Sequence, residues 1–197
     1  MTNINKEQCV INSSISNLQK SLYERTPETS DHCNRMQQLA LAFARRIGLS
    51  NSDIEKLLLF ALLHDIGKIA IPKCILQKPA RLDEEEWEIM SSHSYIGYQI
   101  AKSYPELKMI SNLILSHHER WDGKGYPQGL KGQEIPLLSR IITIIDSYDA
   151  MLDNRPYKKS LSKAEAIEEL KSNSGTQFDP DMVLEFTKLM LFSTYGI

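Results

Sequence analysis

The chain has 197 residues, of which 42% are hydrophobic and 24% are charged, and its formal net charge is −2. This is the composition of a soluble globular protein of one domain, and it argues against a DNA or membrane-surface binder that works through bulk positive charge. Three cysteines, Cys9, Cys33 and Cys74, are too few for a disulfide framework and favour a reduced, cytoplasmic setting. The N-terminus does not read as a signal peptide, and the longest strongly apolar run is too short to span a membrane.

The spacing of apolar residues predicts an almost wholly helical chain. The expected helices cover residues 10–22, 36–44, 54–63, 87–100, 109–114, 137–151, 167–170 and 183–189. The segment 54–63 is apolar almost all round, so we expect it at the centre of the fold. The segment 137–145 is rich in β-branched residues and would suit a strand by itself, but helical spacing continues through Met151 and favours a helix.

Capping signals place several of the helix ends. Asp83 with Glu86, and Ser162 with Glu165, have the spacing of capping boxes. The other boundary signals are Gly48 as a stop, Asn51 or Ser52 as a cap, and Asp179 as a cap before Pro180. The segment 67–82 holds a glycine and two prolines, and we expect an extended loop there. The glycine-rich segment 122–136 is predicted to be a second loop, long enough to suggest a function.

The histidines are the candidate functional residues of the chain. Each of them lies at a predicted helix end or beside a predicted loop. They are His32, His64, His93, His117 and His118. Glu28 lies four residues before His32, on the same face of a helical turn. Asp65 follows the apolar helix directly after a histidine, and Asp146 ends another apolar run, where an unpaired carboxylate would be costly. One histidine alone would be an ordinary core or surface residue, so the prediction depends on their joint occurrence.

Five imidazoles and three carboxylates exceed the ligands of one octahedral ion and suit two or three divalent ions that share carboxylates. Nitrogen and oxygen donors without thiolate favour iron, manganese, cobalt, nickel or zinc over magnesium or calcium. Two such ions about 3.5–4 Å apart can clamp the attacking and leaving oxygens of a displacement at phosphorus, and can activate water near neutral pH. Asp65 is the expected bridge, and Lys68 could neutralise a phosphate oxygen.

Several long, ordered motifs resemble the HD-GYP family. They are His64-Asp-Ile-Gly-Lys68, His117-His-Glu-Arg-Trp-Asp-Gly-Lys-Gly-Tyr-Pro127, Asp146-Ser-Tyr-Asp149 and Phe178-Asp-Pro180. The match covers nearly the whole chain, and its departures, such as Ala80 where the family usually has glycine, remove no ligand.

This resemblance implies an all-α HD-superfamily helical bundle with a GYP loop. It divides the chain into an N-terminal helix or linker at 1–25 and an HD-GYP domain at 26–197. It implies hydrolysis of the bacterial second messenger cyclic di-GMP to pGpG, GMP or both. The cofactors implied are two or three divalent transition metal ions, with iron favoured and manganese as the alternative.

The resemblance also assigns roles residue by residue. The implied metal ligands are Glu28, His32, His64, Asp65, His93, His117, His118 and Asp146. Asp65 and Lys68 are the expected catalytic residues. The implied substrate contacts are Lys68, Gly125, Tyr126, Pro127, Arg155 and Lys158. The family further suggests a protein contact through the GYP loop, for example with a GGDEF domain, and a homodimer is compatible with it.

Other functions stay open at this point. The substrate could be another cyclic dinucleotide, such as 3′,3′-cGAMP, or the chain could bind cyclic di-GMP without catalysis. A di-iron oxygenase is a further alternative on an HD fold, against which Lys68 argues. The sequence has no GxSxG elbow and no Walker loop, and Cys33 beside His32 is interpreted as a bystander thiol because adjacent side chains usually point apart. Metal identity, product and input signal are beyond what the sequence decides.

Overall fold

A computed structural model of the chain describes residues 15–26, 30–153 and 160–192. Residues 15–23 are helical. The helices that follow are α2 (Ser30–Arg46), α3 (Asn51–Leu63), α4 (Lys73–Leu76), α5 (Glu84–Ser91), α6 (His93–Ser103), α7 (Ser111–Leu115), α8 (Leu137–Leu152), α9 (Lys163–Ser172) and α10 (Pro180–Phe192). Short 3-10 helices are η1 (Ile66–Ala70), η2 (Lys108–Ile110) and η3 (Gly132–Glu134). The described residues contain no β-strand, only an isolated bridge between Ser174 and Phe178, so the predicted all-α class is confirmed.

The core forms where α2, α3 and α8 pack together, with α10 closing one side. Several apolar residues of α3 and α8, such as Phe60 and Ile144, are fully buried, and each such side chain stabilises the fold by about 1.5–3 kcal/mol. Phe186 of α10 meets Phe43 and Tyr148 edge-on, with ring centroids 5.2 Å apart in both pairs. The sequence predicts segment 54–63 at the centre of the fold, but it joins this core along one face only: Leu57, Phe60, Ala61 and Leu63 are buried, whereas its other apolar residues are partly buried.

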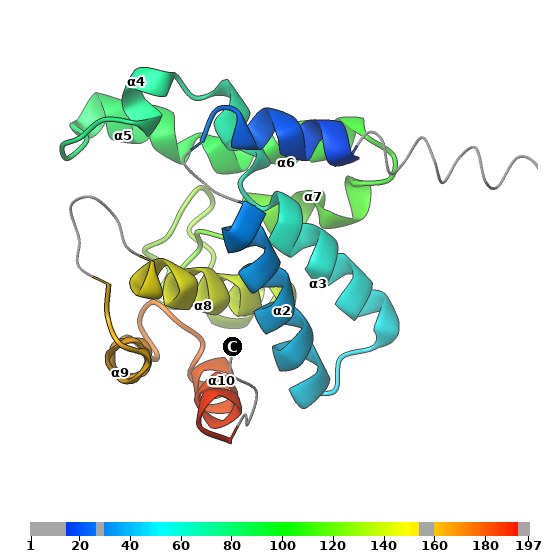
Figure 1. The fold of residues 1–197 in the computed structure, drawn as a ribbon, viewed down its shortest axis with the longest axis vertical. Helices are drawn as coiled ribbons and strands as arrows, with labels where there is room; N and C mark the ends of the chain where they lie inside the picture. Colours follow the sequence, from blue (N-terminus) through cyan, green and yellow to red (C-terminus); the bar gives the residue numbers. More distant parts are fainter. Residues whose placement is uncertain (1–14, 27–29, 154–159, 193–197) are drawn as a thin grey trace, which may run out of the picture.

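The helices of Figure 1 lie in an upper and a lower set. α4, α5 and α6 run across the top, α8, α9 and α10 lie below, and α2 and α3 run downward from the junction on the right, beside α8. α6 packs on η1 and α7, while α2 packs on both α3 and α8. The beginning of α2 and the end of α3 meet at the junction of the two sets, which is where the first two histidines of the chain lie.

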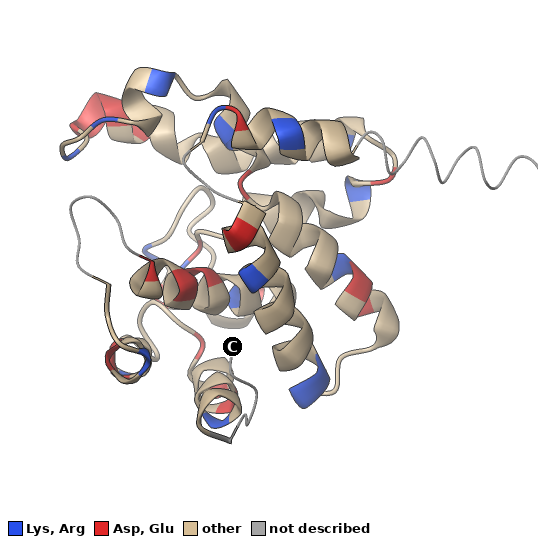
Figure 2. Ribbon diagram, viewed as in Figure 1, with Lys and Arg blue, Asp and Glu red and all other residues tan. Residues whose placement is uncertain are grey.

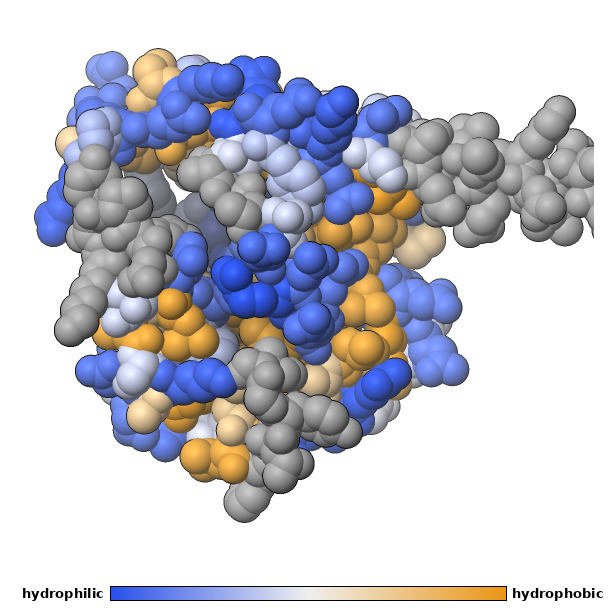
Figure 3. Space-filling model, in the orientation of Figure 1, coloured by the Kyte–Doolittle hydropathy of each residue, from blue (hydrophilic) through white to orange (hydrophobic). Residues whose placement is uncertain are grey.

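The surface carries both positively and negatively charged side chains. Figure 2 shows Lys and Arg interspersed with Asp and Glu, in keeping with the small net charge. Figure 3 shows hydrophilic residues over most of the same face, with smaller apolar patches between them. No helix in the described ranges is long and apolar enough to cross a membrane.

Most of the predicted boundaries are confirmed. Both capping boxes are present, at Asp83 and at Ser162, and Asp179 accepts from the backbone N–H groups of Asp181 and Met182. Gly48 follows the end of α2 and has a φ of 72°, as expected of a glycine that stops a helix. The predicted cap at Asn51 or Ser52 is wrong, because the Ser50 hydroxyl accepts from the backbone of Asp53 and is the N-cap of α3.

The extended loop predicted for 67–82 is wrong in its first half. The chain turns tightly through η1, where the backbone N–H of Lys68 donates to the carbonyl of Asp65, and then forms α4. Gly67 permits this course, because a Cβ atom there would lie 1.8 Å from the carbonyl oxygen of His93. The backbone of η1 can therefore lie directly against α6, which brings Asp65 next to His93.

The single helix predicted through 87–100 is also wrong, because it breaks at Ser92. The Ser92 N–H is shared among the carbonyls of Glu88, Ile89 and Met90, which tightens the last turn of α5. α6 then starts at His93. The break places His93 at the first position of a helix, facing η1 and α7.

The long loop between α7 and α8 is held by a buried carboxylate. Glu119 is 2% exposed, and its two oxygens accept from the backbone N–H groups of Gln128 and Leu130, at 2.7 and 3.0 Å. Gly125 packs against the backbone at Arg120, where a Cβ atom would lie only 2.4 Å from the amide nitrogen. The predicted loop is thus an ordered element that folds back onto its own start.

Candidate metal centre

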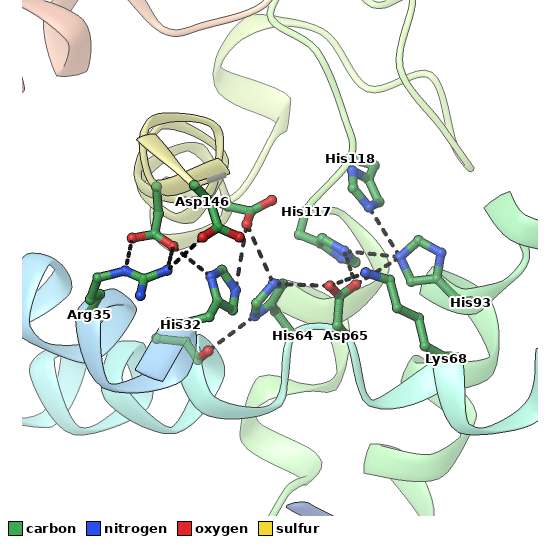
Figure 4. A network of polar contacts seen from close by, with 12 residues as sticks. His32, Arg35, His64, Asp65, Lys68, His93, His117, His118 and Asp146 are labelled. Carbon is green, nitrogen blue, oxygen red and sulfur yellow. Dashed lines mark hydrogen bonds and ion pairs between the residues drawn. The ribbon is translucent and has the colours of Figure 1, made fainter. Parts of the chain in front are cut away.

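The histidines and two carboxylates gather into two clusters at the junction of the upper and lower helices (Figure 4). We call His32, His64 and Asp146 the first cluster, and Asp65, His93, His117 and His118 the second cluster. In each cluster the ligand atoms lie within 4.8 Å of one another. The side chains come from α2, the end of α3, the start of α6, the end of α7 and the middle of α8, so only the folded chain assembles them.

Backbone carbonyls fix the tautomers of three of these histidines. The Nδ1 atoms of His64, His93 and His117 lie 3.1, 2.7 and 2.6 Å from the carbonyl oxygens of the residues three positions earlier. A carbonyl only accepts hydrogen bonds, so each Nδ1 carries a proton. In the neutral ring the Nε2 atom then presents a lone pair, as in the second-sphere arrangement of protein metal sites.

The second cluster therefore brings the acceptor atoms of His93, His117 and Asp65 together. Nε2 of His93 lies 3.3 Å from Nε2 of His117, and these atoms lie 3.2 and 3.6 Å from Oδ1 of Asp65. Within the described residues this buried oxygen receives no hydrogen bond. Burial lowers the pKa of His117, so a proton there is disfavoured too. A cation resolves such an arrangement, and these residues fit a divalent transition metal ion.

Asp65 stands between the two clusters. Its Oδ1 faces the second cluster, whereas its Oδ2 lies 3.3 Å from Nε2 of His64 in the first. Burial alone would raise the pKa of this carboxyl, but Lys68 and His64 beside it hold the pKa well below the usual range. The group is therefore a carboxylate with one oxygen toward each cluster, which is the geometry a bridging ligand needs.

The first cluster is oriented from behind by a second carboxylate, Asp149 of α8. Nδ1 of His32 donates to Asp149 at 2.7 Å, and its Nε2 lies 3.9 Å from Asp146. The guanidinium of Arg35 donates two hydrogen bonds to the same carboxylate, at 2.6 and 2.8 Å. Burial would raise the pKa of Asp149, but His32 and Arg35 together lower it. The carboxylate thus fixes the His32 ring with its Nε2 toward the cluster.

Hydroxyl groups tie α8 to the histidine segment. Thr143 donates its hydroxyl to the carbonyl of His117 at 2.8 Å, and Ser139 donates to that of Leu113 at 3.1 Å. These bonds link the helix that carries Asp146 to the segment that carries the second cluster. The spacing between the two clusters is therefore set by packing within the core.

An aromatic ring covers the second cluster on its outer side. Tyr126 stacks on His118, with centroids 4.9 Å apart and planes 25° from parallel. Burial raises the pKa of Tyr126 above its ordinary value, and burial together with two neighbouring histidines lowers the pKa of His118 well below its own. Both rings stay neutral at pH 7, so His118 is available as a ligand.

The structure brings together most of the residues predicted for the site. Seven of the eight predicted ligands belong to the two clusters. The Nζ atom of Lys68 lies 2.5 Å from Oδ2 of Asp65. Gly125 and Pro127 flank Tyr126, with Gly125 packed on backbone and Pro127 exposed. Glu28, Arg155 and Lys158 lie outside the described residues.

Three residues that support the site were given no role from the sequence: Arg35, Asp149 and Glu119. Their signal is spacing, since Arg35 follows His32 by three residues and Asp149 follows Asp146 by three. Residues three apart lie on the same face of a helix, so Arg35 shares a face with His32 and Asp149 shares a face with Asp146. The two faces can then meet when the two helices pack together. Glu119 directly follows the histidine pair, but which N–H groups it would accept from depends on how the loop returns.

A family model described as HD domain matches residues 16–182. The chain belongs to the HD domain family. The resemblance to HD-GYP proteins is confirmed as well, since curated relatives of this HD domain are named for cyclic dinucleotide hydrolysis. A protein of Thermotoga maritima named cyclic di-GMP phosphodiesterase is 44% identical over 167 residues, which are 84% of this chain and 45% of that protein. A protein of Vibrio cholerae named 3′3′-cGAMP-specific phosphodiesterase 2 is 36% identical over 169 residues, or 85% of this chain and 32% of that protein.

The fold of this HD domain is also found among solved structures. A cyclic GMP-AMP-specific phosphodiesterase of V. cholerae, V-cGAP3, superposes with a TM-score of 0.68 at 22% identity, covering 90% of this chain and 48% of that one. The chain thus spans less than half the length of these relatives.

Proposed function

We propose that this HD domain is a metal-dependent phosphodiesterase that hydrolyses cyclic di-GMP to pGpG, GMP or both. The observation that carries the proposal is Asp65, a buried carboxylate with one oxygen toward each of two histidine clusters. That arrangement suits two ions at the spacing that phosphoryl displacement requires. The relatives named as cyclic dinucleotide phosphodiesterases support the substrate class.

The residues of the chain have separable roles in this reaction. Divalent ions held by the two clusters would activate water and neutralise phosphate oxygens. The ammonium of Lys68 has three N–H bonds, so it can hold Asp65 and also donate to a non-bridging phosphate oxygen in the transition state. Asp149 and the backbone carbonyls keep the imidazoles in the tautomer that a ligand requires.

For the ions we propose iron, with manganese as the alternative, as the resemblance to HD-GYP proteins implies; the imidazole and carboxylate donors without thiolate suit either metal. Two ions suit the two clusters, and a third would need Glu28. The domain division at residue 25, the cytoplasmic setting, the GGDEF contact and the dinucleotide contacts of Arg155 and Lys158 stay predictions.

The test compares site variants with a matched surface variant. We expect His64→Ala and Asp65→Ala to lose hydrolysis of cyclic di-GMP, because each removes a ligand, while far-ultraviolet circular dichroism stays helical. Glu55→Ala, on the exposed face of α3, should hydrolyse at the unmodified rate. The protein is reconstituted with Fe²⁺ or Mn²⁺ under anaerobic conditions, and products are separated by chromatography. Full activity in either site variant would refute the assignment, and binding without turnover by the unmodified protein would favour a binding module.

A second substrate deserves the same assay. The V. cholerae relative named for 3′3′-cGAMP matches 85% of this chain at 36% identity. Side-by-side turnover of cyclic di-GMP and 3′,3′-cGAMP decides between them, and the larger kcat/KM identifies the substrate.

A further inference from the structure

Trp87 is a large aromatic side chain that the fold leaves half exposed, at 51%. It lies on α5, and its indole meets the ring of Tyr126 edge-on, with centroids 5.9 Å apart at 80°. A single exposed hydrophobic residue is ordinary in itself. Trp87 differs from the other exposed hydrophobic side chains because Tyr126, the residue that it contacts, stacks in turn on His118 of the second cluster.

The three rings form a continuous aromatic row from a metal ligand to the surface. His118 is the inner end, Tyr126 is the middle, and Trp87 is the outer end. The two inner rings are partly buried, whereas the indole has half of its surface available to a ligand. A molecule bound at the clusters that is long enough to follow the row would reach the indole.

The indole is held on a fixed frame. The capping box between Asp83 and Glu86 closes the first turn of α5, and the backbone N–H of Trp87 donates to the carbonyl of Asp83 at 2.9 Å. Lys78 forms an ion pair with Glu86 that ties the preceding loop to the helix. A ring fixed in this way loses little conformational freedom when a ligand stacks on it.

The charges around Trp87 disfavour a phosphate and suit an uncharged ring. Glu84, Glu85 and Glu88 are exposed on the same short helix, and Figure 2 shows the acidic end of α5 at the upper left. At the other end of the row, Lys68 and the divalent ions that the two clusters would hold supply the positive charge that a phosphodiester needs. With its ions bound, the site would be cationic within and aromatic at the rim, which matches the order of phosphate, ribose and base in a nucleotide.

We propose that Trp87 stacks on one purine base of the cyclic dinucleotide whose phosphodiester is cleaved at the clusters. This inference rests on the proposed function and adds a substrate-affinity residue to it. Stacking of a base on an aromatic side chain contributes about 1–3 kcal/mol and accepts any base. Trp87 therefore determines how tightly the substrate is held and leaves the chemical step unchanged.

The experiment separates KM from kcat in the metal-reconstituted protein. Trp87→Ala should raise KM for cyclic di-GMP about tenfold, with kcat within about twofold of the unmodified value. Trp87→Phe keeps an aromatic face and should stay within about threefold in KM. The matched control is Tyr95→Ala, since Tyr95 is 53% exposed on α6 and pairs with Tyr98 instead of the aromatic row.

A binding readout accompanies the kinetics. A slowly hydrolysed phosphorothioate analogue of cyclic di-GMP should quench the tryptophan fluorescence of the unmodified protein. Trp87→Phe should lose that quench while Trp121 still emits. An unchanged KM in Trp87→Ala, with hydrolysis intact, would overturn the inference and leave the proposed function standing. A fall in bound metal in Trp87→Ala would also overturn it, because the indole would then act by supporting Tyr126. If the unmodified protein hydrolyses no cyclic dinucleotide, the proposed function fails and this inference fails with it.

Discussion

At the scale of single residues, the proposed metal ligands depend on partners outside the two clusters. His32 is the clearest case, because its ring is fixed by Asp149, and Asp149 is fixed by two bonds from Arg35. Such a carboxylate raises the basicity of the imidazole and limits its rotation. The cost of losing it should therefore appear in metal affinity more than in the stability of the fold.

Asp149→Asn tests this chain of contacts. The amide removes the negative charge behind His32 and presents an N–H group toward either His32 or Arg35, so the metal affinity of the first cluster should fall about 10–100-fold. Metal titration measures the dissociation constant. Asp153→Asn is the control, because Asp153 lies 4.0 Å from the same Arg35 but is half exposed. Equal affinities in the two variants would contradict the role of Asp149.

The grouping of these histidines and carboxylates could be predicted from the sequence because histidine is rare and the motifs around it are long. The partition into two clusters could not, since it depends on how α8 docks beside the segment of His117 through Thr143. The role of Asp149 was missed for the same reason, because its partner His32 lies 117 residues away in the chain.

At the scale of elements, local signals predicted helices well and irregular segments poorly. Capping boxes depend on residues three apart, so Asp83 and Ser162 marked their helices correctly. The tight course of η1 instead depends on contact between Gly67 and the backbone of α6, which no local pattern contains. The order of the loop that carries Tyr126 also depends on a contact that no local pattern contains, because the buried Glu119 carboxylate accepts hydrogen bonds from its backbone.

Glu119→Gln should loosen this loop. A glutamine amide keeps one acceptor oxygen but sets an N–H group against a backbone N–H, which costs about 1–3 kcal/mol in a buried site. Hydrogen exchange at the amides of Gln128 and Leu130 should become at least about tenfold faster. Glu134→Gln is the matched control, because Glu134 accepts from Lys131 in the same loop at an exposed position. Unchanged protection in Glu119→Gln would show that the loop is held by other contacts.

At the scale of the whole molecule, the clusters join helices that belong to the upper and lower sets. An ion bound only by the folded chain stabilises that state, by about 2.7 kcal/mol when its concentration is 100 times its dissociation constant. Chelation of the reconstituted protein should therefore lower the thermal midpoint in calorimetry, and added Mn²⁺ should restore it. Identical midpoints with and without metal would mean that the clusters hold no ion.

The metal-free protein should also lose stability on acidification. Burial lowers the pKa of His117 and His118 below the 6.5 of an exposed histidine, so between pH 7 and pH 5 the unfolded chain binds more protons than the folded chain. The free energy of unfolding consequently falls as the pH falls through this window. The pKa of Asp65 is held below 3.8, so that carboxylate loses its contribution only at lower pH. Urea titrations at both pH values measure the change, and a protein more stable at pH 5 would contradict it.

The division into two clusters has a consequence for biosynthesis. The second cluster takes its ligands from residues 65 to 118, whereas the first needs residues 32 and 146. When translation has passed His118, the nascent chain already contains every ligand of the second cluster. Asp146 and the helix that positions it are still to be translated. Every ligand of the second cluster is therefore translated before α8, whereas the first cluster is completed only once α8 has emerged and packed.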